Sequence, residues 1–294
     1  MSDYQTLNND HFNATADKYD NIPSAAELTA KGSQTILREF RASTSDENVK
    51  NATVLDFGCG TGLSAHIVAK EVKYLVGLDA SEGMLKQFNE KVNTNPEHAD
   101  IKSKVQTIEH LVTNESPLPE PERTQFSEGF DLVYSSYVMH HIDDVDGVVK
   151  AIANNLVKEK TGWFIVLDFS GSHGHGHAHA HGHGHGHGHA HAHGHGHGHG
   201  HAHAHAHGHS HGHSHGGSNC KNKEQAQGEQ EKKGDDEQNL EIPAFVAHDG
   251  FSRARLEEVF RNAGLVDVSS DIAFKVDNHV HVWKEAILVK GRRP

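Results

Sequence analysis

The chain has little cysteine and no long hydrophobic run in its 294 residues. Two cysteines, Cys59 and Cys220, are too few for a disulfide framework, which favours a reducing compartment. The first residues lack the basic flank and apolar core of a signal peptide, and no stretch approaches the ~18 apolar residues of a membrane span. These absences predict a soluble intracellular protein, cytoplasmic with a nuclear location also open, and no membrane partner.

Positive charge is also scarce. The sequence has 27 Lys and Arg against 40 Asp and Glu, a formal net charge of −13. Because nucleic acids and anionic membranes attract clustered cations, this balance counts against both and favours small or neutral molecules as partners. The oligomeric state is not encoded in any pattern that we recognise.

Aromatic residues make up only 6% of the chain and apolar residues 35%, so a sizeable core requires that a polar segment stays outside it. Such a segment is visible, because 171–217 alternate His with Gly, Ala or Ser and 218–238 are rich in Lys, Glu, Gln and Asp. Neither part can offset the entropy cost of ordering a chain. We expect one domain, built from 1–170 and 240–294, with a disordered insertion at 171–239. Residues 1–10 are also expected to be disordered.

The most informative segment is the run VLDFGCGTG at residues 54–62. A short apolar strand leads into a turn with glycines at 58, 60 and 62, which can take positive φ and let the backbone approach a ligand closely. The acidic Asp56 before the turn disfavours bound phosphate, so a cationic cofactor is favoured over a pyrophosphate one. A second strand, VGLD at 76–79, ends in Asp79, where a βαβ unit places a carboxylate for two ribose hydroxyls.

Strand patterns alternate with helical patterns along the chain. Strands are expected at 52–57, 74–78, 105–112, 130–135 and 162–168. This alternation specifies a parallel sheet with right-handed crossovers. Ligands then bind at the carboxyl ends of the strands, where the strand order reverses.

With these motifs the chain resembles the class I S-adenosylmethionine-dependent methyltransferases. The runs VLDFGCGTG and VGLDAS are similar to the first two motifs of that family, and 130–144 and 162–168 to its fourth and fifth strands. Residues 12–20 resemble the N-terminal helix that covers the cofactor in small-molecule members, and 248–265 resemble the last helix. The resemblance implies a Rossmann-like three-layer α/β sandwich with a seven-stranded, mostly parallel sheet and an antiparallel last strand.

The resemblance also implies a set of residues that bind S-adenosyl-L-methionine. Asp56 is expected to hold the methionine amino group and Asp79 to accept from both ribose hydroxyls. Met84 is expected to pack on the adenine, although a methionine on a helix is as often core filling. Either Glu109 or His110 could meet the adenine amino group. The full expected set is Asp56, Gly58, Cys59, Gly60, Thr61, Gly62, Asp79, Ala80, Met84, Glu109, His110 and Ser135.

The segment 135–141 follows the fourth strand, where this family has the wall between cofactor and acceptor. Methyl transfer depends mainly on alignment and desolvation, and only poor nucleophiles need a base. An imidazole with a pKa near ~6.5 suits removal of a proton from a hydroxyl, amine or thiol. The catalytic candidates are therefore Tyr137, His140 and His141, with His248 as a further candidate for the acceptor pocket. The alternative is that one histidine caps the next helix and the other packs in the core.

The tract at 173–215 has no counterpart in the family. Imidazoles at every second position of a flexible backbone can bind nickel, zinc or copper through varying ligand sets, as in the metal-storing stretches of nickel chaperones and zinc transporters. A low-complexity expansion tolerated in a surface loop is the alternative. Candidate metal ligands within the tract include His173, His175, His177, His179, His181 and His183.

The expected function is methyl transfer from S-adenosylmethionine to a small-molecule acceptor, whose identity the sequence does not encode. The chain lacks an Asn-Pro-Pro-Tyr type of sequence after the fourth strand, which counts against methylation of DNA adenine or glutamine. Two alternatives stay open. One is a nickel- or zinc-buffering protein that uses a methyltransferase scaffold as a carrier, and the other is a protein methyltransferase.

Overall fold

A computed structural model of the chain describes residues 3–171, 246–276 and 285–294. Apart from Gly171, the insertion expected at 171–239 lies outside the described residues, and so do all the histidines of the metal prediction.

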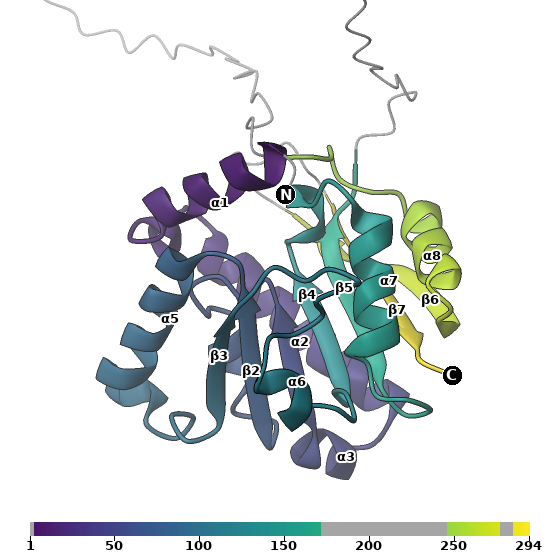
Figure 1. Ribbon diagram of the computed structural model, residues 1–294, viewed down its shortest axis with the longest axis horizontal. Helices are drawn as coiled ribbons and strands as arrows, with labels where there is room; N and C mark the ends of the chain where they lie inside the picture. The colour runs from purple at the N-terminus through teal and green to yellow at the C-terminus, as the bar shows by residue number, and fades with distance from the viewer. Residues whose placement is uncertain (1–2, 172–245, 277–284) are drawn as a thin grey trace, which may run out of the picture. The chain divides into compact units, whose positions relative to one another are not determined.

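Within the described residues, seven strands form one sheet in the order β3-β2-β1-β4-β5-β7-β6 (Figure 1). Strands β1 to β5 run parallel, and β7 lies antiparallel between β5 and β6. The expected fold class is therefore confirmed. The strands are β1 (Thr53–Phe57), β2 (Tyr74–Asp79), β3 (Val105–Glu109), β4 (Leu132–Ser136), β5 (Trp163–Phe169), β6 (Val266–Lys275) and β7 (Glu285–Arg292).

Helices cover both faces of this sheet (Figure 1). The longer ones are α1 (Asp3–Thr15), α2 (Ala25–Ser43), α5 (Glu82–Thr94), α7 (Val145–Asn155) and α8 (Arg253–Asn262). The short ones are η1 (Tyr19–Asn21), α3 (Asp46–Asn51), α4 (Ala65–Val68), η2 (Pro96–His98), α6 (Glu122–Gln125) and η3 (Met139–His141).

The central strands are apolar on both sides, because each side packs against helices. In β1, Val54 belongs to the core formed with α2, α4 and α5, whereas the next residue, Leu55, belongs to the core formed with α7 and α8. The same alternation separates Leu132 from Val133 in β4. Successive side chains of a strand point to opposite faces, so these near-continuous apolar runs specify a three-layer sandwich.

The expectation that residues 1–10 are disordered is wrong, because α1 begins at Asp3. Its sequence is polar and has no clear apolar stripe, so the signal for a helix is weak. The structure shows what orders it. The Asn13 side chain accepts hydrogen bonds from Ser81 Oγ (2.8 Å) and from the Gly83 backbone N–H (2.9 Å), at the start of α5. Tertiary contacts thus replace the missing local signal.

Strand β3 is shorter than the expected range 105–112. It ends at Glu109, and the His110 N–H still donates to the Asp79 carbonyl oxygen of the neighbouring β2 (3.0 Å). Ser170 precedes the polar insertion and Phe251 follows it, and these two residues form an isolated parallel bridge. The described chain therefore leaves and re-enters the sheet at neighbouring positions. None of the described helices combines the length and apolar character that a membrane crossing needs.

Candidate functional site

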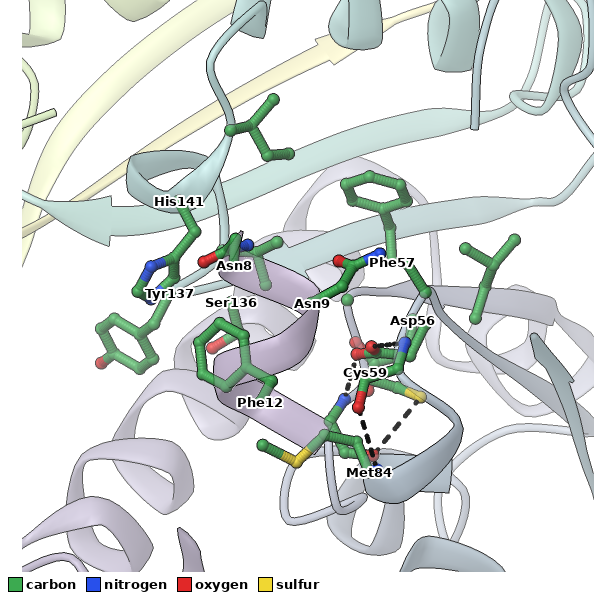
Figure 2. A pocket seen from close by; sticks show the side chains of 18 of the residues that line it. Asn8, Asn9, Phe12, Asp56, Phe57, Cys59, Met84, Ser136, Tyr137 and His141 are labelled. Carbon is green, nitrogen blue, oxygen red and sulfur yellow. Dashed lines mark hydrogen bonds between the residues drawn. The ribbon is translucent and has the colours of Figure 1, made fainter. Parts of the chain in front are cut away.

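The carboxyl ends of β1, β2 and β4 surround a hollow that is partly open to solvent. It lies where the strand order reverses around β1, as expected for a ligand site in an open α/β sheet. Helix α1 passes over it and contributes Asn8, Asn9 and Phe12 to its lining (Figure 2).

The glycine turn after β1 has a backbone that other residues would strain. Gly58 has φ 73°, and a Cβ built on it would lie 2.5 Å from Val138 Cγ2. Gly62 has φ 84°, and its Cβ would lie 2.7 Å from the Phe88 ring. Gly60, between them, has φ 53° and no heavy atom within 4 Å of that position. The outer glycines allow close packing, and Gly60 leaves open space beside the hollow.

Asp79 connects the end of β2 to this turn. One of its carboxylate oxygens accepts from the Gly60 N–H (2.8 Å) and the other from the Ser81 N–H (2.9 Å). Burial raises the pKa of Asp79, while hydrogen bonds from the backbone of Ser81, Gly60 and Ala80 oppose that rise. Because a carboxylate has about four acceptor positions, Asp79 can still accept from two hydroxyls of a ligand.

Asp56 is the least satisfied charged group at the hollow. It is 1% exposed, and its Oδ2 has no hydrogen-bond partner among the described residues. Burial raises the pKa of Asp56 to about 7, a hydrogen bond with Tyr134 lowers it, and the nearby Asp79 carboxylate raises it further. A buried carboxylate oxygen without a partner is costly and is relieved by a cationic donor. The site therefore fits the amino group of S-adenosylmethionine.

Most of the residues expected to bind the cofactor lie together at this hollow. The lining includes Asp56, Gly58, Cys59, Gly60, Thr61, Asp79, Ala80, Met84 and His110. Gly62 packs against Phe88 behind the turn, and Ser135 is fully buried in β4. The next residue, Ser136, lines the hollow instead of Ser135, because side chains alternate along a strand.

The choice between Glu109 and His110 at the end of β3 depends on the same alternation. Glu109 is exposed and lies outside the lining, whereas His110 lines the hollow. The His110 ring is held by the Ser116 carbonyl oxygen, 2.8 Å from its Nε2. The structure thus places His110, and not Glu109, where an adenine contact is expected.

The catalytic candidates after β4 occupy different environments. His141 lines the hollow, and its ring meets Phe12 of α1 edge to face, with centroids 5.0 Å apart. His140 is 3% exposed and lies outside the lining. Its Nδ1 is 2.7 Å from Asp168 Oδ1 at the end of β5, and its backbone N–H donates to Asp168 Oδ2 (3.2 Å). Of the two histidines, His141 lines the hollow and His140 does not.

Tyr137 also lines the hollow, but its hydroxyl points to the neighbouring helix and donates to the Leu28 carbonyl oxygen (3.3 Å). Its backbone has φ 60°, an uncommon value for tyrosine. Burial, and then the Asp168 carboxylate, raise the pKa of Tyr137, so the phenol stays protonated at neutral pH. Tyr137 therefore forms part of the wall, and its hydroxyl is engaged by the backbone of α2.

His248 lies beside the same turn but outside the lining. Its Nε2 is 2.9 Å from the Ile142 carbonyl oxygen, and its backbone N–H donates to the His140 carbonyl oxygen (3.1 Å). His248 thus holds the turn after β4 through two hydrogen bonds to its backbone.

Sequence reasoning missed the polar side chains of α1. Gln5, Asn8 and Asn9 line the hollow, although residues 1–10 are expected to be disordered from their composition. One available signal is that 3–15 contain neither glycine nor proline, so nothing interrupts a helix that reaches Phe12.

Metal ligands do not gather at this hollow. In the part of the chain that the structure describes, no group of three or more His, Cys, Asp or Glu side chains is placed to hold a metal ion. The metal prediction for the histidine tract lies outside those residues and is untouched by this result.

A strand, a glycine turn and two acidic residues at the carboxyl end of a Rossmann-like sheet define a class of nucleoside-cofactor proteins. Comparison with known proteins gives the chain's family within that class. The family model described as a methyltransferase domain matches residues 30–213, more than half of the chain, so this chain belongs to the methyltransferase domain family.

Two curated relatives agree with this family. A protein named ubiquinone biosynthesis O-methyltransferase from Pelagibacter ubique is 27% identical over 132 residues, covering 45% of this chain and 48% of that protein. A protein named an uncharacterized methyltransferase from Schizosaccharomyces pombe is 31% identical over 186 residues, covering 53% of this chain and 62% of the relative. The chain thus matches about half to three fifths of the length of these relatives.

Solved structures share the fold at low sequence identity. Magnesium protoporphyrin IX methyltransferase from Synechocystis, solved with bound S-adenosylmethionine, is 12% identical with a TM-score of 0.55, over 100% of this chain and 99% of that one. A methyltransferase from Haloferax volcanii, solved with the activator Trm112, is 15% identical with a TM-score of 0.53, over 96% and 97% of the two chains. These likenesses support the fold.

Proposed function

We propose that this protein transfers a methyl group from S-adenosylmethionine to a small-molecule acceptor. The observation that carries the proposal is the buried Asp56 carboxylate oxygen, which has no hydrogen-bond partner in the described part of the chain and lies in the same hollow as the glycine turn and Asp79. In S-adenosylmethionine the cationic amino group matches Asp56, the methionine chain matches the glycine turn, and the ribose matches Asp79. Membership of the methyltransferase domain family supports the same function.

Each group at the hollow has a task in this proposal. When bound, S-adenosylmethionine supplies a methyl group on a sulfonium sulfur, a leaving group that needs little further activation. Asp56 would hold the amino group, and Asp79 would accept from the ribose hydroxyls. Met84, which is 2% exposed, would pack against the adenine, with His110 beside it.

The acceptor side is built from the turn after β4 and from α1. His141 would take the proton of a hydroxyl, amine or thiol as the acceptor atom forms its bond to carbon, and would pass that proton to solvent. The His140–Asp168 pair would fix the turn that carries His141. The name of the Pelagibacter relative supports oxygen as the acceptor atom. The position of α1 over the hollow favours a small acceptor over a protein chain.

Calorimetry with S-adenosylhomocysteine tests the cofactor part of the proposal. Wild type should bind in the micromolar range, and Asp79→Ala should lose at least about tenfold in affinity because two hydrogen bonds from the ribose are lost. Glu109→Ala is the matched control, because this exposed carboxylate lies directly beside Asp79 in the register of β2 and β3. Equal losses in both variants, or no binding to folded wild type, would contradict the proposal.

Nickel or zinc buffering remains a separate proposal for the histidine tract. It rests on the sequence of 173–215, which lies outside the described residues. Removal of the tract separates the two activities.

A further inference from the structure

Two polar atoms on the acceptor side of the hollow have no hydrogen-bond partner among the described residues. Asn8 is 6% exposed, and its side-chain oxygen finds no hydrogen-bond donor among the described residues. Ser136 Oγ is also buried without a described partner. Both residues line the hollow. Buried polar groups are almost always hydrogen-bonded in native proteins, so two such atoms in one cavity indicate a ligand that satisfies them.

The neighbouring asparagine provides an internal comparison. Asn9 also lines the hollow from α1, but its side-chain oxygen already accepts from Gln5 Nε2 (3.0 Å). The unsatisfied state is therefore specific to Asn8 and is not a general property of the amides on this helix.

The two unpartnered atoms lie away from the cofactor residues. In Figure 2, Asn8, Ser136, Tyr137 and His141 gather on one side of the view, while Asp56 and Cys59 lie on the other. Asn8 comes from α1 and Ser136 from the end of β4, so one ligand contacting both would connect the helix to the sheet. The positive φ of Tyr137 sets the direction of the chain directly after Ser136.

The charges around the hollow limit the ligand. Among its described lining residues there is no Lys or Arg, and two of them, Asp56 and Asp79, are acidic. A carboxylate or phosphate on the acceptor would lose its hydration without gaining a fixed cation. An uncharged acceptor has no such cost.

Aromatic rings line part of the hollow beside α1. Phe12 meets His141 at 5.0 Å and Tyr19 at 6.3 Å, in both cases edge to face. Both partners of Phe12 also line the hollow. Aromatic rings pair favourably with another ring, either offset-stacked or edge to face.

We propose that Asn8 and Ser136 form the acceptor-binding subsite, and that it selects an uncharged, ring-bearing molecule carrying an N–H or O–H donor. The Asn8 oxygen accepts from that donor, and the Ser136 hydroxyl satisfies a second polar atom of the same molecule. This inference rests on the proposed methyltransferase function, because it assigns the remaining part of the hollow to the acceptor.

Three matched probes test the subsite in protein saturated with S-adenosylhomocysteine. Benzamide is neutral and has an N–H donor, benzoate has the same shape with a negative charge, and N,N-dimethylbenzamide has no donor. Binding is followed by saturation-transfer NMR, with dissociation constants from titration. Benzamide should bind in wild type, at least about fivefold more tightly than either analogue, the difference expected for one hydrogen bond.

Variants of the full chain assign that difference to residues. Asn8→Leu keeps a similar side-chain volume and should weaken benzamide about fivefold, bringing it to the level of the donor-free analogue. Ser136→Ala should give a smaller loss and serves as a second variant if Asn8→Leu folds poorly. Asn9→Leu is the matched control and should weaken benzamide less than Asn8→Leu, because the Asn9 oxygen already has a donor.

The outcomes separate the two proposals. If wild type binds S-adenosylhomocysteine but fails to bind benzamide, or binds benzoate equally well, the subsite proposal is wrong and the methyltransferase proposal stands. The same holds if Asn9→Leu costs as much as Asn8→Leu. If folded wild type does not bind S-adenosylhomocysteine, the proposed function itself fails.

Discussion

Binding of S-adenosylmethionine should release a proton from Asp56. Burial raises the pKa of this carboxyl to about 7 in the ligand-free protein, and its Oδ2 has no described partner. A bound amino group would hold the carboxylate in its ionised form. We therefore expect release of about 0.5 proton per molecule bound at pH 7, rising to about 0.9 at pH 6 and falling to about 0.1 at pH 8.

The affinity should follow the same titration. Only the ionised carboxylate accepts the amino group, so protonation competes with binding as the pH falls through about 7. The dissociation constant should be about tenfold larger at pH 6 than at pH 8. S-adenosylhomocysteine should behave in the same way, because it carries the same amino group.

Calorimetry in two buffers with different ionisation enthalpies counts the released protons. Two controls isolate Asp56 from the histidines at the hollow. 5′-Methylthioadenosine lacks the amino acid part and should release no proton from Asp56, and Asp56→Asn should remove the pH dependence along with most of the affinity. A proton count near zero in wild type at pH 6, or the same count in Asp56→Asn, would refute the reasoning.

Three further predictions concern stability, the covering helix and the insertion. Asp56→Asn should stabilise the ligand-free protein by up to about 4 kcal/mol at pH 8, measured by urea unfolding. The raised pKa of Asp56 means that the wild type loses stability as the pH rises from about 4 to about 7, and the variant does not. An unchanged urea midpoint would contradict this. Asn13→Ala removes both hydrogen bonds between α1 and the start of α5 and should lower the stability of α1 by about 1 kcal/mol. Amide exchange should then become faster than in wild type in α1, and stay unchanged in α2. Deleting 173–215 should change the dissociation constant of S-adenosylhomocysteine less than about twofold, because Ser170 and Phe251 pair beside the insertion, and should abolish most nickel retention on a chelating column. Loss of cofactor binding in the deletion, or retained nickel binding, would show that the two parts are not separable.

The sheet and the cofactor side of the site could be predicted from the sequence because their signals are local. The run from Val54 to Gly62 combines an apolar strand with glycines, and the structure explains two of them by steric limits at Gly58 and Gly62. Asp79 ends a strand that pairs directly with β1. Strand, turn and carboxylate are close in sequence as well as in space, so a single pattern describes them.

The acceptor side could not be predicted in the same way, because it depends on contacts between distant segments. The partner of His140 is Asp168, 28 residues away, and no spacing rule indicates this pair. Asn8 lies on a helix that tertiary contacts hold in place. The choice of Ser136 over Ser135 requires the direction of each side chain in β4, which a sequence pattern with two adjacent serines leaves open.

A crystal structure of the protein with S-adenosylhomocysteine tests the central claim most directly. The account predicts that the ligand amino group lies within hydrogen-bond distance of Asp56 Oδ2 and that both ribose hydroxyls donate to Asp79. A ligand that occupies the hollow with its ribose away from Asp79 and its amino group away from Asp56, or that binds elsewhere on the protein, would contradict it.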